Sequence, residues 1–263
     1  MELANAIVLA GGKNSPEMVT ATGVENRALV ELATGRTMLD FIVDALKGAS
    51  GIRTITVVGD VPAIPGVTIV TPGDTMLDNI LIGIDAARPA PGERVLIVTS
   101  DIPFVTAEAV DDFLQRALAL TADFCYPIIP MDTYYREFAG MKRTTLKLRD
   151  GHFTGGNLVM MNPVMLTNNR ELIMRVYAAR KDVLALGRML GWGLLMRIIV
   201  SQLAFPRLLS VAELEVGVAR LLGPDAIVKA VVTQYASIGT DVDKPDDVEF
   251  ARDRLSRPSA AAI

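Results

Sequence analysis

Two loops of this 263-residue chain carry aspartates directly after strand-like runs. Asp101 lies in TSDIPF, and Asp241 and Asp243 lie in SIGTDVDKPDD. In open α/β sheets, ligands bind beyond the carboxyl ends of the strands, where carboxylates from two strands can meet. Magnesium prefers one or two carboxylates together with phosphate oxygens and water, so the pattern indicates a Mg²⁺–polyphosphate site. Each aspartate alone also fits a structural role, as a turn cap before Ile-Pro or a helix start before Pro245.

The loop after the first strand-like run, LAGGKN, contains Gly11 and Gly12. Because glycine has no Cβ, backbone N–H groups can approach a phosphate or a base closely there. A glycine loop beside two carboxylates suits an in-line displacement at phosphorus, in which the protein mainly positions the reactants and neutralises charge. The sequence therefore favours chemistry on a nucleotide or another polyphosphate.

The elements that must position these loops alternate along the first half of the chain. Apolar, β-branched runs are separated by helix-like segments, which is the pattern of βαβ units in a parallel sheet. Each helix-like segment opens with a threonine that can serve as the N-cap. The predicted strands are 6–10, 54–59, 67–70, 94–100 and 123–129, and the predicted helices are 37–47, 75–87 and 106–120. We therefore expect a doubly wound α/β sheet.

After about residue 130 the pattern changes. The segment KRTTLKLRDGHFTGGNLVMMN contains two strand-like runs joined by Arg-Asp-Gly, which is a hairpin signal. Helical patterns, a strand at 227–232 and a helix at 248–255 follow. We predict a single domain over 1–255, which includes an antiparallel hairpin insertion at 130–161 and a helical segment at 163–222. A disordered tail is predicted to follow at 256–263.

The composition argues against several classes of protein. A formal net charge of −4 and a pI near 5.2 disfavour a nucleic-acid-binding surface. The single cysteine, Cys125, allows no intramolecular disulfide and suits a reducing compartment. The N-terminus has no basic region typical of a signal peptide, so we expect a cytoplasmic protein. The single histidine, His152, is predicted to lie in the hairpin turn, and chemistry at phosphorus does not need it.

The most apolar part of the chain is LALGRMLGWGLLMRIIVSQLAF, residues 184–205. Arg188 and Arg197 interrupt it, and no uncharged stretch approaches the roughly 18 residues that span a bilayer. Two interpretations stay open. The segment is a buried helix or a homodimer interface, or it contacts a membrane surface or a hydrophobic acceptor.

Four motifs in order resemble one family. AIVLAGG, NRALVEL with the following helix GRTMLDFIVDALKGA, VLIVTSDIPFVT and DVDKPDDVEFAR are similar to the nucleotidyltransferases of the GT-A fold, particularly the molybdenum-cofactor guanylyltransferase-like (MobA-like) NTP transferases. The resemblance covers most of residues 5–161 and returns at 238–254. It implies a Rossmann-like GT-A nucleotide-diphospho-sugar transferase fold. It also implies Mg²⁺-dependent transfer of NMP from an NTP to a phosphate-bearing small-molecule acceptor, with release of pyrophosphate.

The resemblance also assigns roles by position. Asp101 and Asp243 would hold the metal, and Asp241 is a further candidate ligand. The nucleotide base and triphosphate would be lined by Leu9, Ala10, Gly11, Gly12, Gly73, Asp74 and Asn79. The acceptor would lie against the TGGN segment, through Gly155, Gly156 and Asn157, and its phosphate would meet Lys142 and Arg143. For these two basic residues a solvated strand edge is an equally open interpretation.

The glycine loop departs from the family's pattern. The family continues LAGG-x-G-x-R-M-G towards a lysine, whereas Lys13 to Met18 stand here and Arg27 takes the lysine position. Arg27 preserves the charge, and Lys13 could replace the missing arginine, so we predict Arg27, Lys13 and Asp101 as the catalytic residues. An unreplaced phosphate contact would cost about 1.5–3 kcal/mol, which weakens an enzyme without abolishing it.

Two other functions stay open. A catalytically weak nucleotide-binding or scaffolding protein would keep the carboxylate loop and lose the triphosphate clamp, and it would bind NTP without turnover. A GT-A glycosyltransferase is disfavoured because the carboxylate loop is Asp-Ile-Pro, where that class has Asp-x-Asp. Neither the base of the NTP nor the acceptor follows from the sequence.

Overall fold

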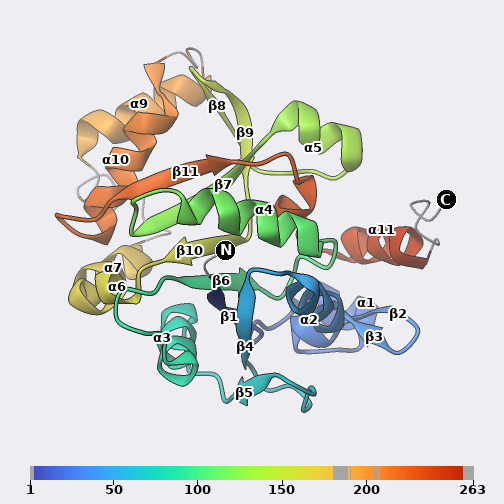
Figure 1. The fold of residues 1–263 in the computed structure, drawn as a ribbon. Coiled ribbons are helices and arrows are strands. Elements are labelled where there is room, and N and C mark those ends of the chain that lie inside the picture. The colour runs from blue at the N-terminus through green and yellow to red at the C-terminus, as the bar shows by residue number, and fades with distance from the viewer. Residues whose placement is uncertain (1–2, 180–188, 190, 204, 206–207, 257–263) are drawn as a thin grey trace.

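The structure, a computed structural model, describes residues 3–179, 189, 191–203, 205 and 208–256. Over these residues its centre is a nine-stranded sheet in the order β5-β4-β1-β6-β10-β7-β9-β8, with β11 paired to β7 (Figure 1). The strands are β1 (Ala4–Leu9), β4 (Ile52–Val58), β5 (Thr68–Val70), β6 (Val95–Thr99), β7 (Phe124–Pro130), β8 (Thr145–Leu148), β9 (Gly151–Gly155), β10 (Leu158–Met161) and β11 (Val228–Val232). Strands β9 and β10 are antiparallel to the other seven strands, which all run in one direction. This confirms the predicted mainly parallel α/β sheet.

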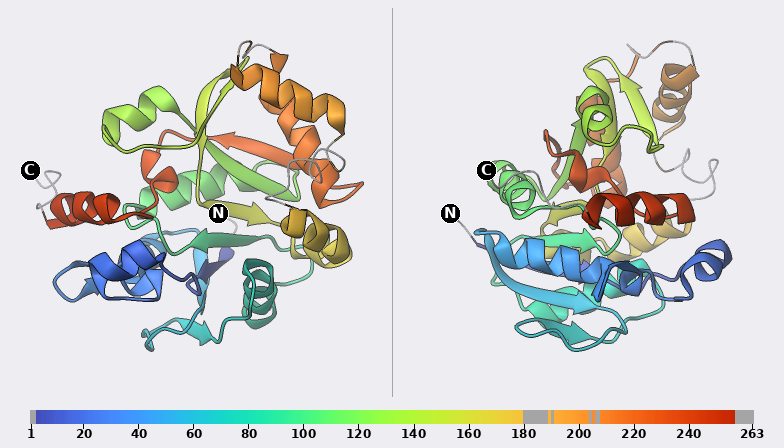
Figure 2. Two further views of the ribbon diagram at one scale, coloured as in Figure 1. Left: turned by 180° about the vertical axis from the view of Figure 1, so that it is seen from behind. Right: turned by 90° about the vertical axis from the view of Figure 1, so that its right-hand side faces the viewer.

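Helices cover both faces of the sheet, so the strands are apolar on both sides. In β1, Ala6 and Val8 pack against α2 and α4, whereas Ile7 and Leu9 pack against the helices of the opposite face. Figure 2 shows the layers from behind and from the side. The first layer is α2 (Met38–Gly48) and α4 (Ala107–Leu118), and the second is α3 (Met76–Ala87), α6 (Pro163–Asn168) and α7 (Arg170–Ala179).

The three predicted helices of the first half are confirmed, and their threonines act as N-caps. The hydroxyl oxygens of Thr37, Thr75 and Thr106 accept hydrogen bonds from backbone N–H groups in the first turn. Asp40 and Asp78 complete capping boxes at α2 and α3. Because each cap satisfies a backbone donor that a helix start would leave unpaired, these residues fix where the helices begin.

The predicted hairpin is confirmed as β8 and β9, but it is more elaborate than its sequence signal. Leu148 pairs with Gly151, so the turn consists of Arg149 and Asp150. His152 therefore lies in β9 opposite Lys147, and its predicted place in the turn is wrong. A helix, α5 (Met131–Glu137), precedes the hairpin, and β10 returns between β6 and β7.

The C-terminal half is helical around β11. It contains α9 (Trp192–Leu203), α10 (Val211–Leu222) and α11 (Pro245–Ser256). Parts of the predicted 163–222 helical segment, and the predicted tail at 257–263, lie outside the described residues. Helix α11 begins three residues before its predicted start because a proline suits the first helical position and Asp247 accepts the N–H of Lys244. Ser256, expected in the tail, is the last residue of this helix.

The apolar segment at 184–205 is described mainly as α9. Its inner face, with Leu194 and Ile198, packs on the cluster that holds Phe153. Trp192, Met196 and Ile199 are exposed at helical spacing. In the described part of the chain no helix is long and apolar enough to cross a membrane. The homodimer, membrane-surface and hydrophobic-acceptor interpretations of this segment stay predictions.

A second apolar cluster, absent from the sequence prediction, joins the two ends of the chain. It lies beside the sheet and includes Met18, Leu32, Phe138, Val248 and Ala251. It brings together α5, α11 and two N-terminal elements, α1 (Pro16–Thr22) and β2 (Glu31–Ala33). Between these two lies η1 (Arg27–Leu29), and β2 pairs with β3 (Arg36–Thr37). The loop after β1 is therefore fixed against the C-terminal segment.

Gly83 on α3 tests the packing of the second helical layer. A Cβ at this position would lie 2.3 Å from Cγ2 of the fully buried Ile7. We expect Gly83→Ala to push α3 from the sheet and to lower the free energy of unfolding by about 1–3 kcal/mol, despite the better helix propensity of alanine. Urea denaturation measures this. Gly193→Ala on α9 is the control, because a Cβ there meets nothing within 4 Å. Equal effects of the two substitutions would contradict the expectation.

Candidate active site

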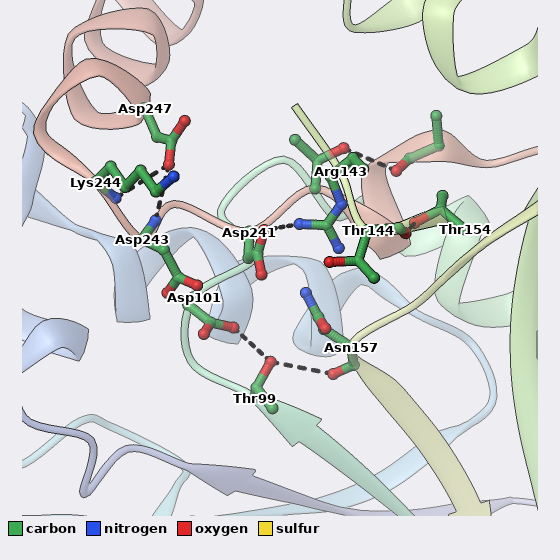
Figure 3. Close-up of polar contacts among 12 residues, drawn as sticks. Thr99, Asp101, Arg143, Thr144, Thr154, Asn157, Asp241, Asp243, Lys244 and Asp247 are labelled. Atoms are coloured by element: carbon green, nitrogen blue, oxygen red, sulfur yellow. Dashed lines mark hydrogen bonds and ion pairs between the residues drawn. The ribbon is translucent and has the colours of Figure 1, made fainter. Parts of the chain in front are cut away.

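Three loops meet at the carboxyl edge of the parallel strands. Leu9 at the end of β1 pairs with Thr99 at the end of β6, so the loops that follow emerge side by side. The C-terminal loop joins them, because the Val242 N–H donates to the Asp101 carbonyl oxygen at 2.8 Å. Figure 3 shows Asp101, Asp241 and Asp243 gathered at this edge, with Arg143 and Asn157 reaching towards them from other segments. The three aspartates predicted from separate loops thus lie together at one edge of the sheet.

Arg27 bridges the two predicted metal ligands. Its Nη1 lies 3.2 Å from Oδ2 of Asp101 and also forms an ion pair with Oδ1 of Asp243. The Arg27 and Asp101 side chains are one-quarter exposed or less, so solvent screens their attraction only partly. A cationic group therefore sits between two carboxylates that are 142 positions apart in the chain.

Asp101 is held in a polarised environment. Burial of the Asp101 carboxyl group raises its pKa, and the nearby carboxylate of Asp243 raises the pKa further. The hydrogen bond that Oγ1 of Thr99 donates to Oδ1 at 2.6 Å lowers the pKa, and so does the guanidinium of Arg27. The backbone N–H of Thr99 donates to the Asn157 carbonyl oxygen at 3.1 Å, which ties β6 to the start of β10. The Asp101 carboxylate is thereby fixed in position, and its pKa is above the usual value for aspartate.

The donor set fits a hard divalent cation. Two carboxylates converge on one cationic nitrogen, and oxygen ligands of this kind suit Mg²⁺. Over the described residues, no cluster of three or more His, Cys, Asp or Glu side chains forms a complete protein cage.

The glycine loop presents backbone to the site. Leu9 and Ala10 are buried, so only their main-chain groups can face a nucleotide. A Cβ on Gly11 would lie 3.0 Å from Nδ2 of Asn79, whereas a Cβ on Gly12 would meet nothing within 4 Å. The absence of a Cβ at Gly11 therefore allows close packing against Asn79, whereas Gly12 borders open space.

The altered segment after the glycine pair folds as a short helix and returns towards the site. The N–H of Arg27 donates to the Gly12 carbonyl oxygen at 2.9 Å. Lys13 forms a β-bridge with Asn26, directly before Arg27. The two basic residues that we predicted to replace the family's arginine and lysine therefore lie on the same wall, and the Lys13 side chain is exposed.

The predicted base-side residues lie next to Gly11. The side-chain oxygen of buried Asn79 accepts the Gly73 N–H at 2.7 Å. A Cβ on Gly73 would approach Cβ of Asp78 to 2.9 Å, so the backbone passes the start of α3 closely. Asp74 is exposed beside this turn. Gly11, Gly73, Asp74 and Asn79 thus form one continuous edge.

The predicted acceptor residues line the opposite side. A polar cavity of about 580 Å³ contains Lys142, Arg143, Asp241, Asp243 and Lys244. Arg143 forms an ion pair with Asp241, so the carboxylate of this further candidate metal ligand is already paired. The two basic residues thus face a cavity that also borders the acidic site.

Gly155 and Gly156 are glycines for packing reasons. A Cβ on Gly155 would lie 2.1 Å from the Tyr126 hydroxyl oxygen, and one on Gly156 would lie 2.7 Å from Ile238. Asn157 follows where the chain leaves β9 for β10, and its carbonyl oxygen also accepts the Thr99 hydroxyl at 3.2 Å. The TGGN segment is therefore a closely packed crossing between the acceptor side and Asp101.

Sequence reasoning missed Thr99, Lys244 and Asp247. The hydroxyl two residues before Asp101 was a usable signal, because such a side chain can reach the carboxylate that follows it in a turn. Asp247 accepts the N–H groups of Asp243 and Lys244, at 3.2 and 3.0 Å, and so shapes the loop that carries Asp243. The sequence DKPDD was a usable helix-start signal for it.

The sheet order and the acidic loops at its carboxyl edge define a protein of the nucleotidyltransferase fold. The MobA-like NTP transferase domain family matches residues 6–191, and the chain belongs to this family. A hypothetical transferase from Thermus thermophilus is similar over 94% of this chain and 99% of its own, with 36% identity and a TM-score of 0.78.

More distant structures share the fold. The 2-C-methyl-D-erythritol 4-phosphate cytidylyltransferase from Thermus thermophilus has 16% identity and a TM-score of 0.54, over 98% of this chain and 100% of that one. A CMP:2-keto-3-deoxy-manno-octonic acid synthetase complexed with CTP has 12% identity and a TM-score of 0.58, over 97% and 99%. A comparison with curated protein sequences gives no match.

The raised pKa of Asp101 predicts a cost in stability. The folded protein binds this proton more tightly than the unfolded chain, whose aspartates titrate near about 3.9. The contribution of Asp101 to stability therefore falls as pH rises from the unfolded pKa through the folded one. We expect Asp101→Asn to gain stability relative to the wild type between about pH 4 and about pH 7, in urea denaturation with chelator present.

The control for this experiment is Asp44→Asn, which removes a largely exposed carboxylate on α2. A stability difference between Asp101→Asn and the wild type that stays constant over this pH range, or that shrinks at the higher pH, would refute the expectation.

Proposed function

We propose that this protein is a Mg²⁺-dependent nucleotidyltransferase that transfers NMP from an NTP to a phosphate-bearing small molecule and releases pyrophosphate. The observation that carries the proposal is the convergence of Asp101 and Asp243 on the guanidinium of Arg27, directly beside the Gly11–Gly12 backbone. Family membership supports nucleotidyl transfer as the general activity.

On the nucleotide side, the chain supplies both backbone and charge. The base and ribose lie along the edge formed by Gly11, Gly73 and Asn79, and the triphosphate crosses Gly12 towards Lys13 and Arg27. Both cationic side chains come from one wall, because Lys13 bridges Asn26 and Arg27 bonds to Gly12. They neutralise the charge of the phosphates and orient the α-phosphorus towards the acceptor side.

On the acceptor side, Lys142 and Arg143 hold the acceptor phosphate in the polar cavity. Asp241 fixes the guanidinium of Arg143 by its ion pair. An oxygen of the acceptor phosphate attacks the α-phosphorus and forms a new P–O bond. The bond from the α-phosphorus to the bridging oxygen breaks, and that oxygen leaves with its electron pair on pyrophosphate. No proton transfer is needed, so the reaction requires no histidine.

Asp101 and Asp243 would hold the Mg²⁺, which supplies charge neutralisation at the phosphate oxygens when bound. The pairing of both carboxylates with Arg27 balances their charge when no nucleotide is present. On binding of the triphosphate, the Arg27 guanidinium turns the N–H donors along its planar edge to phosphate oxygens, for which their geometry is suited.

One observation favours a second function. Because Arg27 engages both carboxylates, a protein in which this ion pair persists would bind nucleotide without turnover. The catalytically weak nucleotide-binding protein is therefore the alternative that the first experiment must separate.

The direct test measures pyrophosphate release from each common NTP with Mg²⁺, against a panel of sugar phosphates, alcohol phosphates and molybdopterin-like acceptors. We expect turnover with one NTP and one acceptor, and a loss of about a hundredfold or more in kcat in Asp101→Ala. Asp44→Ala is the matched control, because it removes an aspartate on the surface of α2. NTP binding without turnover against any acceptor would select the binding protein instead.

Substitutions at Arg27 separate charge from geometry. Arg27→Lys keeps the cation and loses the planar fork, so we expect kcat/KM for the NTP to fall about tenfold. Arg27→Met removes the charge, and we expect a fall of about a hundredfold or more. Lys13→Met should give a loss of about tenfold if its exposed ammonium reaches the triphosphate. Unchanged kinetics in all three variants would place the triphosphate elsewhere.

A further inference from the structure

A second cavity, mainly apolar, adjoins the proposed acceptor site. It has a volume of about 510 Å³ and lies between the strands β7, β9 and β11 and helix α10. Figure 1 shows α10 beside β11 at this end of the sheet. Its wall is made by the side chains of Phe124, Ile128, Leu148, Phe153, Leu214 and Val218.

This cavity is partly open to the surface, so a ligand can enter it. A volume of this magnitude falls within the range of small-molecule binding pockets, whose walls are mostly apolar with a few polar groups. Glu215 also lines the cavity, but Nζ of Lys229 and the Ala230 N–H both donate to its carboxylate at 2.9 Å. That charge is satisfied without a ligand.

One end of the apolar cavity is polar and joins the acceptor site. Arg143 and Thr144 line both this cavity and the polar cavity that holds Asp241 and Asp243. Nε of Arg143 and Nδ2 of Asn157 are buried there, and neither has a hydrogen-bond partner among the described residues. Figure 3 shows both side chains facing the acidic cluster. Buried donors of this kind call for an acceptor oxygen.

We propose that the acceptor is an amphipathic monophosphate, with a phosphate that lies at Arg143 and Asn157 and an apolar body that fills the cavity under α10. This inference rests on the proposed function and adds the class of acceptor. A hydrocarbon body leaves no buried hydroxyl unpaired, whereas a sugar in the same space would bury polar groups against Phe153, Leu214 and Val218. The polar end selects the phosphate, and the apolar wall selects the body.

The first experiment compares alkyl phosphates of increasing chain length as acceptors, with sugar phosphates of similar size beside them. We expect kcat/KM to rise about fourfold for each added methylene, the factor that corresponds to burial of one CH₂ group, until the cavity is full. The KM for the NTP should stay unchanged across the series. A flat dependence on chain length, or a preference for the sugar phosphates, would overturn the proposal.

A pair of substitutions on α10 locates the effect. Val218 lines the cavity, whereas Val216 is 53% exposed on the same helix. Val218→Phe should narrow the cavity, so we expect the gain in kcat/KM for long alkyl phosphates to fall at least about tenfold, with methyl phosphate unaffected. Val216→Phe should leave the series unchanged. Equal responses of the two variants would place the alkyl chain elsewhere, and the wild-type series decides the acceptor class even if Val218→Phe folds poorly.

Calorimetric binding of the same alkyl phosphates separates this proposal from the proposed function. Affinity that rises with chain length and falls in Val218→Phe, without pyrophosphate release from any NTP, would support the amphipathic ligand and reject the transferase. Turnover of a sugar phosphate, with no binding of alkyl phosphates, would support the transferase and reject the amphipathic acceptor.

Discussion

The site depends on an electrostatic balance between Arg27 and two carboxylates that approach it from distant parts of the chain. Asp101 is largely buried, and an unpaired charge in such a place is costly. Thr99 and Arg27 each stabilise the ionised carboxylate, whereas Asp243 opposes its ionisation. Without the guanidinium, two like charges would face each other at the edge of the sheet. Under the proposed function, the same three side chains take part in binding of the metal and of the triphosphate, so the charge balance of the free protein and its ligand binding depend on the same groups.

The balance requires that both ends of the chain be held together. The apolar cluster of α1, α5 and α11 does this, with Met18 and Phe138 fully buried beside Val248. Arg252 adds polar contacts by donating to the Glu31 carbonyl oxygen at 3.0 and 3.1 Å. The Asp243 loop is thus anchored from α11, and the Arg27 turn is anchored from β2. Packing outside the sheet therefore decides the geometry of the charged site.

The elements that could be predicted were those with a local signal. Alternating apolar runs gave the parallel strands, and Thr37, Thr75 and Thr106 marked helix starts because capping acts within one turn. The Asp101 and Asp243 loops were found for the same reason, since each follows a strand. The ion pair between Arg143 and Asp241, and the cluster around Phe138, could not be found, because long-range contacts leave no spacing pattern in a single sequence. His152 was misplaced because the turn consists of Arg149 and Asp150, whereas the Asp-Gly-His signal placed it at residues 150–152.

The two cavities show how one fold can keep its chemistry and vary its acceptor. The charged groups come from the segments that follow β1 and β6, which carry Arg27 and Asp101, and from the loop before α11, which carries Asp243. Much of the apolar wall comes from the β8–β9 hairpin and α10. Arg143 belongs to both, because it precedes β8 and pairs with Asp241. A change in the α10 side chains alters the shape of the apolar cavity without touching Asp101, Asp243 or Arg27. Under the two proposals, acceptor selectivity is therefore separable from nucleotidyl transfer, and Arg143 is the residue that joins the two.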